Sequence, residues 1–173
     1  MIDFIATFIA FFAVIDPIGT VPVFIAVTQL HDERERRRIA LIATLLSAGI
    51  LLFFVVAGEI ILTALSIPLS VFQVAGGIVL FLFALTMIFG ESKPEQELKL
   101  AANGNETAVF PLAVPSIASP GAMLAAVLMT ENTRYSLIEQ VQTAATMLAV
   151  LLVTYLLMLG AGWINRWLGS SGA

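Results

Sequence analysis

The run FIATFIAFFAVIDPIGTVPVFIAVTQL at residues 4–30 decides the fold class. It is longer than the ~20 apolar residues that a helix needs to cross a bilayer, and its only interior charge is Asp16. It also contains Pro17, Gly19 and Pro22, residue types that interrupt helices. The run therefore predicts a membrane-spanning helix with a break and a carboxylate near its middle.

The composition of the whole chain leads to the same class. Of 173 residues, 60% are hydrophobic and only 12% are charged, and the mean hydropathy is +1.01. A soluble protein has about twice that share of charged residues, so this chain cannot cover a soluble surface. The apolar runs are continuous, which favours helices over a barrel. A net charge of −4 argues against nucleic acid as a partner, and the chain has no cysteine.

Five apolar segments follow one another, at residues 4–30, 39–67, 71–89, 109–130 and 136–168. A charged hinge at residues 31–38 follows the first segment, and a polar loop precedes the fourth. We expect an all-α polytopic membrane bundle. Its predicted parts are a three-helix repeat at residues 1–90, a cytoplasmic loop at residues 91–108, and a second repeat, truncated to two helices, at residues 109–173.

The positive charges predict an orientation. If all five segments cross the bilayer, seven of the eight basic residues share one side: Arg34, Arg36, Arg37, Arg38, Lys93, Lys99 and Arg166. Only Arg134 lies opposite. Short loops rich in Lys and Arg stay in the cytoplasm. The sequence thus predicts a multi-pass protein of the cell (inner) membrane, with its N-terminus outside and loop 91–108 in the cytoplasm.

The first and fourth segments carry similar interruptions. DPIG at residues 16–19 and SPG at residues 119–121 place their prolines 103 residues apart, and Ala57-Gly58 recurs as Ala161-Gly162 after 104. Three helices per unit would make the second unit inverted, with discontinuous first and fourth helices. On this spacing a sixth helix would begin past Ala173, so we expect the final helix to be missing from this chain. The alternative is a coincidence between two apolar segments.

The first break is a candidate binding site. Two prolines five residues apart, with Gly19 between them, predict about one turn of unwound helix. Freed backbone groups and a carboxylate are tolerated at membrane depth where they are buried in protein or line a wet cavity. The alternative is a proline kink in which Asp16 caps the following half-helix and Pro17 is its first residue. A cap and a polar pocket do not exclude each other.

The second break has three prolines in FPLAVPSIASPGA, residues 110–122. Ser119 occupies the position of Asp16 and can also cap a half-helix. The two half-helix N-termini would suit a small carboxylate, and the carbonyl ends of the preceding halves would suit an ammonium group. The expected ligand is a small zwitterion. The candidate substrate-binding residues are Asp16, Pro17, Gly19, Thr20, Ser119, Pro120, Gly121 and Ala122.

Asp16 and Glu59 are the candidates for proton coupling. Glu59 interrupts the second apolar segment. A carboxyl group inside a membrane segment can carry a proton, and it can also pair with a polar neighbour. Only about eight residues separate Glu59 from Pro68, so a third alternative places it near the outer membrane edge. The sequence leaves all three open.

Four motifs resemble the MarC family of bacterial and archaeal inner-membrane proteins: DPIGTVPVF at 16–24, AGGIVLFL at 75–82, FPLAVP at 110–115 and SPGA at 119–122. The resemblance implies six membrane helices, a grouping with the LysE-type exporters, and transport of small neutral amino acids such as glycine and alanine. Two residues depart from the family pattern. Ser119 replaces a usual glycine, and Thr20 replaces a usual asparagine.

These observations predict a secondary transporter of small neutral amino acids. The alternative is a non-transporting structural or regulatory membrane protein. An enzyme is not expected, because an intramembrane aspartyl protease needs two membrane-embedded aspartates and only Asp16 qualifies. No cofactor or metal is expected. The expected partners are the lipid bilayer and a small neutral amino acid, while proton coupling and a homodimer are left open.

Overall fold

The described part of the chain is helical. The computed structural model describes residues 3–89 and 108–168, and the predicted loop at 91–108 lies almost entirely outside them. The elements are α1 (Phe4–Ile15), α2 (Pro17–Val27), α3 (Glu33–Ala64), α4 (Leu69–Phe89), η1 (Ala108–Ile117), α6 (Pro120–Leu128) and α7 (Leu137–Leu168). The predicted all-α architecture is confirmed.

Several helices are long and apolar enough to cross a bilayer. Three stretches of the described chain meet both criteria: Phe4–Val27, Glu33–Ala64 and Leu137–Ala161. The pair formed by η1 and α6, bent by 47° at its break, makes a fourth span if its two halves cross as one. In α4 the apolar stretch Leu69–Leu82 is shorter, although the helix continues to Phe89. A crossing by α4 therefore stays a prediction.

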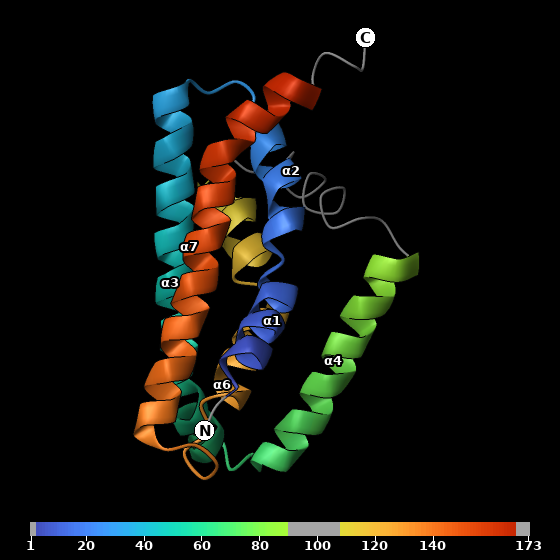
Figure 1. Ribbon diagram of the computed structural model, residues 1–173. Helices are drawn as coiled ribbons and strands as arrows, with labels where there is room; N and C mark the ends of the chain where they lie inside the picture. The colour runs from blue at the N-terminus through green and yellow to red at the C-terminus, as the bar shows by residue number, and fades with distance from the viewer. Residues whose placement is uncertain (1–2, 90–107, 169–173) are drawn as a thin grey trace.

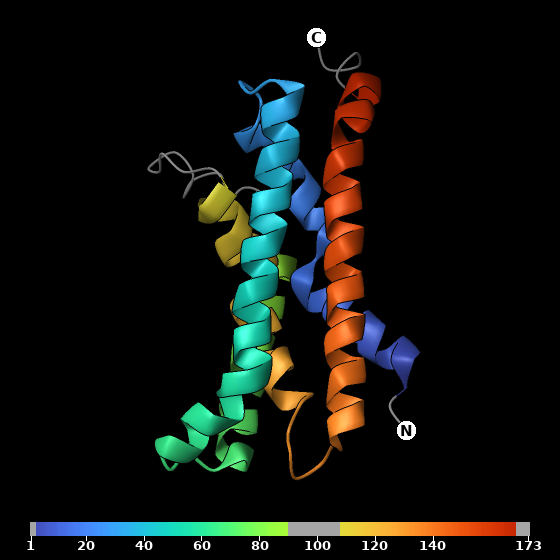
Figure 2. The same cartoon turned by 90° about the vertical axis from the view of Figure 1, so that its left-hand side faces the viewer.

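The two broken spans run antiparallel through the centre of the bundle. α1 packs against α6 and α2 packs against η1, so the first half of one span lies beside the second half of the other. The long helices α3 and α7 flank the two spans (Figures 1 and 2). α3 packs against η1 and α6, whereas α7 packs against α1 and α2. This arrangement places the two breaks inside the protein. It matches the inverted relation that the repeat predicts.

The ends of the helices sort into two groups. The α2–α3 connection and the C-terminal end of α7 lie at one end of the bundle in Figure 1, whereas the C-terminal end of α4 lies about midway along it. The N-terminus, the α3–α4 turn and the α6–α7 connection lie at the other. The first turns of α3, with Arg34, Arg36, Arg37 and Arg38, and the last turn of α7, with Arg166, therefore share one end, whereas Lys93 and Lys99 lie outside the described residues. Which end faces the cytoplasm stays a prediction.

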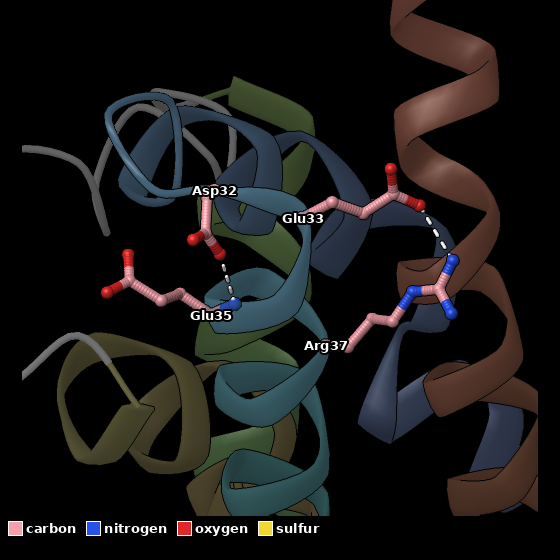
Figure 3. A network of polar contacts seen from close by, with 4 residues as sticks. All are labelled: Asp32, Glu33, Glu35 and Arg37. Carbon is pink, nitrogen blue, oxygen red and sulfur yellow. Dashed lines mark hydrogen bonds and ion pairs between the residues drawn. The ribbon is translucent and has the colours of Figure 1, made fainter.

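The charged hinge is mostly part of α3, which differs from the predicted start at residue 39. Asp32 caps the helix, because its carboxylate accepts a hydrogen bond of 2.7 Å from the Glu35 amide. Glu33 in the first turn complements the positive end of the helix dipole and pairs with Arg37 at 2.7 Å (Figure 3). These local interactions stabilise two polar turns that an apolar pattern does not reveal.

Glycines set the distance between neighbouring helices in two places. Gly58 of α3 faces Val127 of α6, and a Cβ atom added to Gly58 would lie 2.4 Å from a Val127 methyl group. Gly76 of α4 faces Leu124 of α6 in the same way, with 2.5 Å to the nearest methyl. Small residues at helix contacts let backbones approach closely in membrane proteins. α3 and α4 thus both depend on glycine for their contact with α6.

We expect Gly58→Ala to lower the thermal unfolding midpoint of the purified protein in detergent, because its methyl group overlaps Val127. Overpacking of this kind costs about 1–3 kcal/mol. Gly49→Ala is the matched control on the same helix, since a Cβ there meets nothing within 4 Å. Its midpoint should stay or rise, as alanine favours helix by about 0.5–1 kcal/mol. Adding Val127→Ala to Gly58→Ala should restore part of the lost unfolding midpoint, because the smaller side chain makes room for the added methyl group. Equal midpoints for the two glycine variants would contradict this packing.

Candidate binding site at the two helix breaks

The first break is confined to one residue. Asp16 has left-handed backbone angles (φ 52°, ψ 68°), ends α1 and begins α2. Its carboxylate accepts a hydrogen bond of 2.9 Å from the Gly19 amide, and its backbone carbonyl accepts one of 3.1 Å from the Thr20 amide. Pro17 is the first residue of α2, where its missing amide hydrogen has no cost. The predicted cap is therefore present.

The predicted unwinding of about one turn is wrong. α2 is helical from Pro17 onward, and Pro22 lies inside it. The cap explains the difference, because Asp16 supplies acceptors for the first amides of α2 and no further residue has to leave the helix.

The second break is longer and more irregular. η1 is two short helical pieces joined across a kink, and Phe110 and Val114 have extended backbone angles within it. Both residues precede a proline, which disfavours the helical region for them. The Phe110–Pro111 and Val114–Pro115 peptide bonds are cis. The chain therefore departs from a regular helix within the predicted break at residues 110–122, from Phe110 onward.

Ser119 joins the two breaks directly. Its hydroxyl donates a hydrogen bond of 2.8 Å to the carbonyl of Val14 in α1. The same oxygen accepts one of 3.1 Å from the Ala122 amide and so caps α6. The Val14 carbonyl would bond to the amide four residues later in an unbroken helix. The break in the first span thus leaves the Val14 carbonyl without its helical partner, and Ser119 at the break in the second span donates to that carbonyl instead.

A second polar bridge lies beside the first. The Ser116 hydroxyl donates to the Thr20 hydroxyl at 3.3 Å, and Thr20 donates to the Asp16 carbonyl at 3.0 Å. Both hydroxyl-bearing residues are fully buried. Ser47 of α3 is also buried, and its hydroxyl lies 3.2 Å from the carbonyl of Ala113 in η1. The Ser116 and Ser119 hydroxyls therefore connect the second broken span to the first, and the Ser47 hydroxyl, which donates to the Ala43 carbonyl of its own helix at 2.8 Å, lies beside the second span.

Ser116 and Ser47 were not among the residues predicted from the sequence. Each is a single small polar residue in an apolar stretch, and such residues often bond across helix contacts in membranes. That signal could have selected them. The pattern alone does not say which neighbour they face.

The structure brings together most of the predicted site. Thr20, Ser119 and Ala122 are at most 2% exposed. Pro17 and Gly121 are also buried, and Asp16 and Gly19 are half-buried. Pro120 is exposed, so it contributes to the break as the first residue of α6 rather than as a lining residue.

At the start of each half-helix, α2 and α6, one backbone amide has no hydrogen-bond acceptor among the described residues. Pro17 and Pro120 have no amide hydrogen, and the amides of the third residues are capped by Asp16 and Ser119. The second residues are Ile18 and Gly121, and among the described residues no acceptor is found for their amides. These two N–H groups, at the positive ends of two helices, are the donors that a small anionic group could bind.

Glu59 lies apart from the breaks. Its carboxylate accepts a hydrogen bond of 2.7 Å from the amide of Asn132, in the α6–α7 connection. Nearby, the Thr130 hydroxyl lies 3.5 Å from the Val55 carbonyl of α3. Glu59 thus ties the C-terminal part of α3 to this connection, and its place near a membrane edge stays a prediction.

The family model for MarC family integral membrane proteins matches residues 1–173. The chain belongs to the MarC family. The match spans both breaks and all the described helices, so the resemblance seen in the four sequence motifs is confirmed.

Named relatives of this MarC protein occur in archaea and bacteria. A UPF0056 membrane protein of Methanocaldococcus jannaschii is 34% identical over 173 residues, covering 98% of this chain and 83% of the relative. The UPF0056 inner membrane protein YhgN of Escherichia coli is 33% identical over 176 residues, covering 99% and 85%. A UPF0056 membrane protein of Archaeoglobus fulgidus is 32% identical. No solved structure matches the chain.

The family assignment makes this MarC protein an integral membrane protein. The predicted membrane location agrees with it, and the E. coli relative is an inner membrane protein by name. None of these names specifies a substrate. The chemistry of the site therefore has to be argued from the breaks themselves.

Proposed function

We propose that this MarC protein is a secondary transporter of small neutral amino acids such as glycine and alanine, with the substrate held between its two broken helices. The observation that carries the proposal is the contact between the breaks, made by the Ser119 hydroxyl and the Val14 carbonyl. Discontinuous helices that meet inside a bundle form the substrate sites of many secondary transporters.

The two half-helix starts differ in charge, which suggests how a zwitterion would be oriented. The start of α2 already carries the Asp16 carboxylate, whereas the start of α6 carries the neutral Ser119 hydroxyl. A substrate carboxylate is favoured at α6, beside the Gly121 amide, because Asp16 would repel it at α2. The substrate ammonium group is favoured near Asp16 for the opposite reason.

The size of the residues around the breaks supports a small substrate. Gly19, Gly121 and Ala122 offer little or no side chain, and Thr20 and Ser119 add hydroxyl groups. Pro17 and Pro120 set the direction of the two half-helices. Because Thr20, Ser119 and Ala122 are buried, access to the site requires the two broken spans to move apart.

Proton coupling through Asp16 is part of this proposal. A carboxyl group at the site itself can change charge as the substrate binds and leaves. Glu59 is better placed to hold the α6–α7 connection, through its bond to the Asn132 amide. An N-terminus outside the cell, as the basic residues predict, completes the proposed topology.

Substrate binding tests this function. The purified protein should bind glycine or alanine in the millimolar range or tighter. Asp16→Asn should weaken binding about tenfold, the loss expected for one charge-assisted hydrogen bond, and Ser119→Ala should weaken it about as much by removing the bond that holds the two breaks together. Isothermal titration calorimetry in detergent measures both. Thr28→Val is the matched control, because its buried hydroxyl bonds only to Phe24, away from the breaks.

Uptake by proteoliposomes separates the two functional alternatives. The transporter should accumulate labelled alanine in vesicles above the level in protein-free vesicles. A folded, monodisperse protein that neither binds nor transports glycine or alanine would contradict the proposal. That result would favour the non-transporting structural or regulatory role.

A further inference from the structure

An exposed apolar stripe runs along one face of α3, and two arginines stand at its N-terminal end. Leu41, Leu45 and Val56 are 45%, 62% and 70% exposed and recur at helical spacing on one face. Arg34 and Arg38 are exposed and precede Leu41 on that same face, because residues three or four apart are neighbours on a helix. The stripe thus begins with two cations and continues as apolar surface.

The two neighbouring arginines, Arg36 and Arg37, have partners. Arg37 pairs with Glu33 at 2.7 Å, on the neighbouring face of α3 (Figure 3). The guanidinium of Arg36 lies 5.7 Å from the centre of the Phe24 ring. Asp32 caps the helix through the Glu35 amide, and the Glu35 side chain extends to the opposite side of α3 from the Glu33–Arg37 pair (Figure 3).

Arg34 and Arg38 have no ion-pair partner within residues 3–89 and 108–168. Two guanidinium groups one turn apart can bind one phosphate or two adjacent ones, because each presents a planar set of donors. The stripe therefore begins with a site whose charge suits phosphate.

The length of α3 places this site at the membrane surface. A helix of 32 residues is about 48 Å long, whereas the hydrocarbon core of a bilayer is about 30 Å thick. If Leu41, Leu45 and Val56 lie in the core, Arg34 and Arg38 lie among the lipid headgroups. Gly49 leaves a notch in the stripe, since a Cβ atom there would meet nothing within 4 Å.

We propose that Arg34 and Arg38, together with the apolar stripe below them, form a binding site for an anionic phospholipid. The two arginines bind the headgroup phosphate, and one acyl chain lies along Leu41, Leu45 and the Gly49 notch. An acidic peptide would satisfy the arginines but would gain nothing from the apolar stripe. This site does not depend on the proposed transport function, because it lies on the outer face of α3, away from the breaks.

Native mass spectrometry of protein purified in mixed phosphatidylglycerol and phosphatidylcholine micelles tests the site. Wild type should retain phosphatidylglycerol in preference to phosphatidylcholine. R34Q/R38Q should lower that preference about fivefold or more, since each basic residue near an anionic surface contributes roughly that factor. R36Q/R37Q is the matched control with the same change in charge, and its preference should fall much less.

One further variant and one competition measurement complete the lipid-binding test. Gly49→Leu fills the notch without changing charge and should also reduce phosphatidylglycerol retention. Inorganic phosphate should not displace the lipid, because it has no acyl chain. Equal losses in R34Q/R38Q and R36Q/R37Q, no preference in wild type, or displacement by inorganic phosphate would each overturn the proposal. The arginines are exposed, so a monodisperse R34Q/R38Q protein is expected.

Discussion

Gly19→Ala should remove most of the alanine uptake of this protein in proteoliposomes. A Cβ atom on Gly19 would lie 2.1 Å from an oxygen and 2.8 Å from the carboxyl carbon of Asp16. The added methyl therefore cannot coexist with the cap that holds the Asp16 carboxylate on the Gly19 amide. Displacing the carboxylate by an ångström or more should reduce uptake about tenfold or more.

Gly77→Ala is the control for this prediction. It makes the same chemical change in an apolar helix, at a position where a Cβ atom meets nothing within 4 Å. Uptake and the thermal unfolding midpoint should both stay close to wild type. Gly19→Ala should lower the thermal unfolding midpoint, because the loss of one helix cap reduces the free energy of unfolding by about 1 kcal/mol. That loss leaves enough folded protein for the assay. Normal uptake by Gly19→Ala would show that the Asp16 cap is not needed for transport.

The positions of both breaks could be predicted from the sequence, because their determinants are local. Asp16 and Ser119 are good capping residues that directly precede a proline, and the structure confirms both caps. The extent of each break was harder to predict. The Asp16 cap provides acceptors for the Gly19 and Thr20 amides and α2 begins directly after it, whereas the prolines of η1 disturb a much longer stretch.

The irregular backbone of η1 had a signal in the sequence. Phe110 and Val114 each precede a proline, and such residues avoid the helical region. The contacts of η1 had no such signal. It packs against α2 and α3, which the order of residues in one segment does not reveal.

The hydroxyl bridges depend on contacts between segments far apart in the chain. Ser116 meets Thr20 across 96 residues, and Ser47 lies near Ala113 across 66. Apolar periodicity shows that such a residue is in a membrane helix, but it does not determine which helix packs against it. For the same reason the N-terminal turns of α3 were missed, since an apolar pattern cannot detect a polar helix end stabilised by Asp32 and by the Glu33–Arg37 pair.

A cross-link between the breaks is the second prediction with a large expected effect. The Cβ atom of Val14 lies 3.8 Å from the position that a Cβ atom on Gly121 would occupy. That separation is the mean found in disulfides, about 3.8 Å. The chain has no cysteine, so Val14→Cys/Gly121→Cys introduces the only two thiols. A side chain on Gly121 would approach a methyl group of Leu80 at 2.9 Å, and this flexible side chain can move aside.

The central claim is that the breaks of the two antiparallel spans touch each other, and mild oxidation of this variant in membranes tests it most directly. The account predicts nearly complete disulfide formation, read as the loss of maleimide-reactive thiols in the unfolded protein and their return after reduction. Val14→Cys/Gly77→Cys should stay reduced under the same conditions. Free thiols in Val14→Cys/Gly121→Cys at the level of that control would contradict the account.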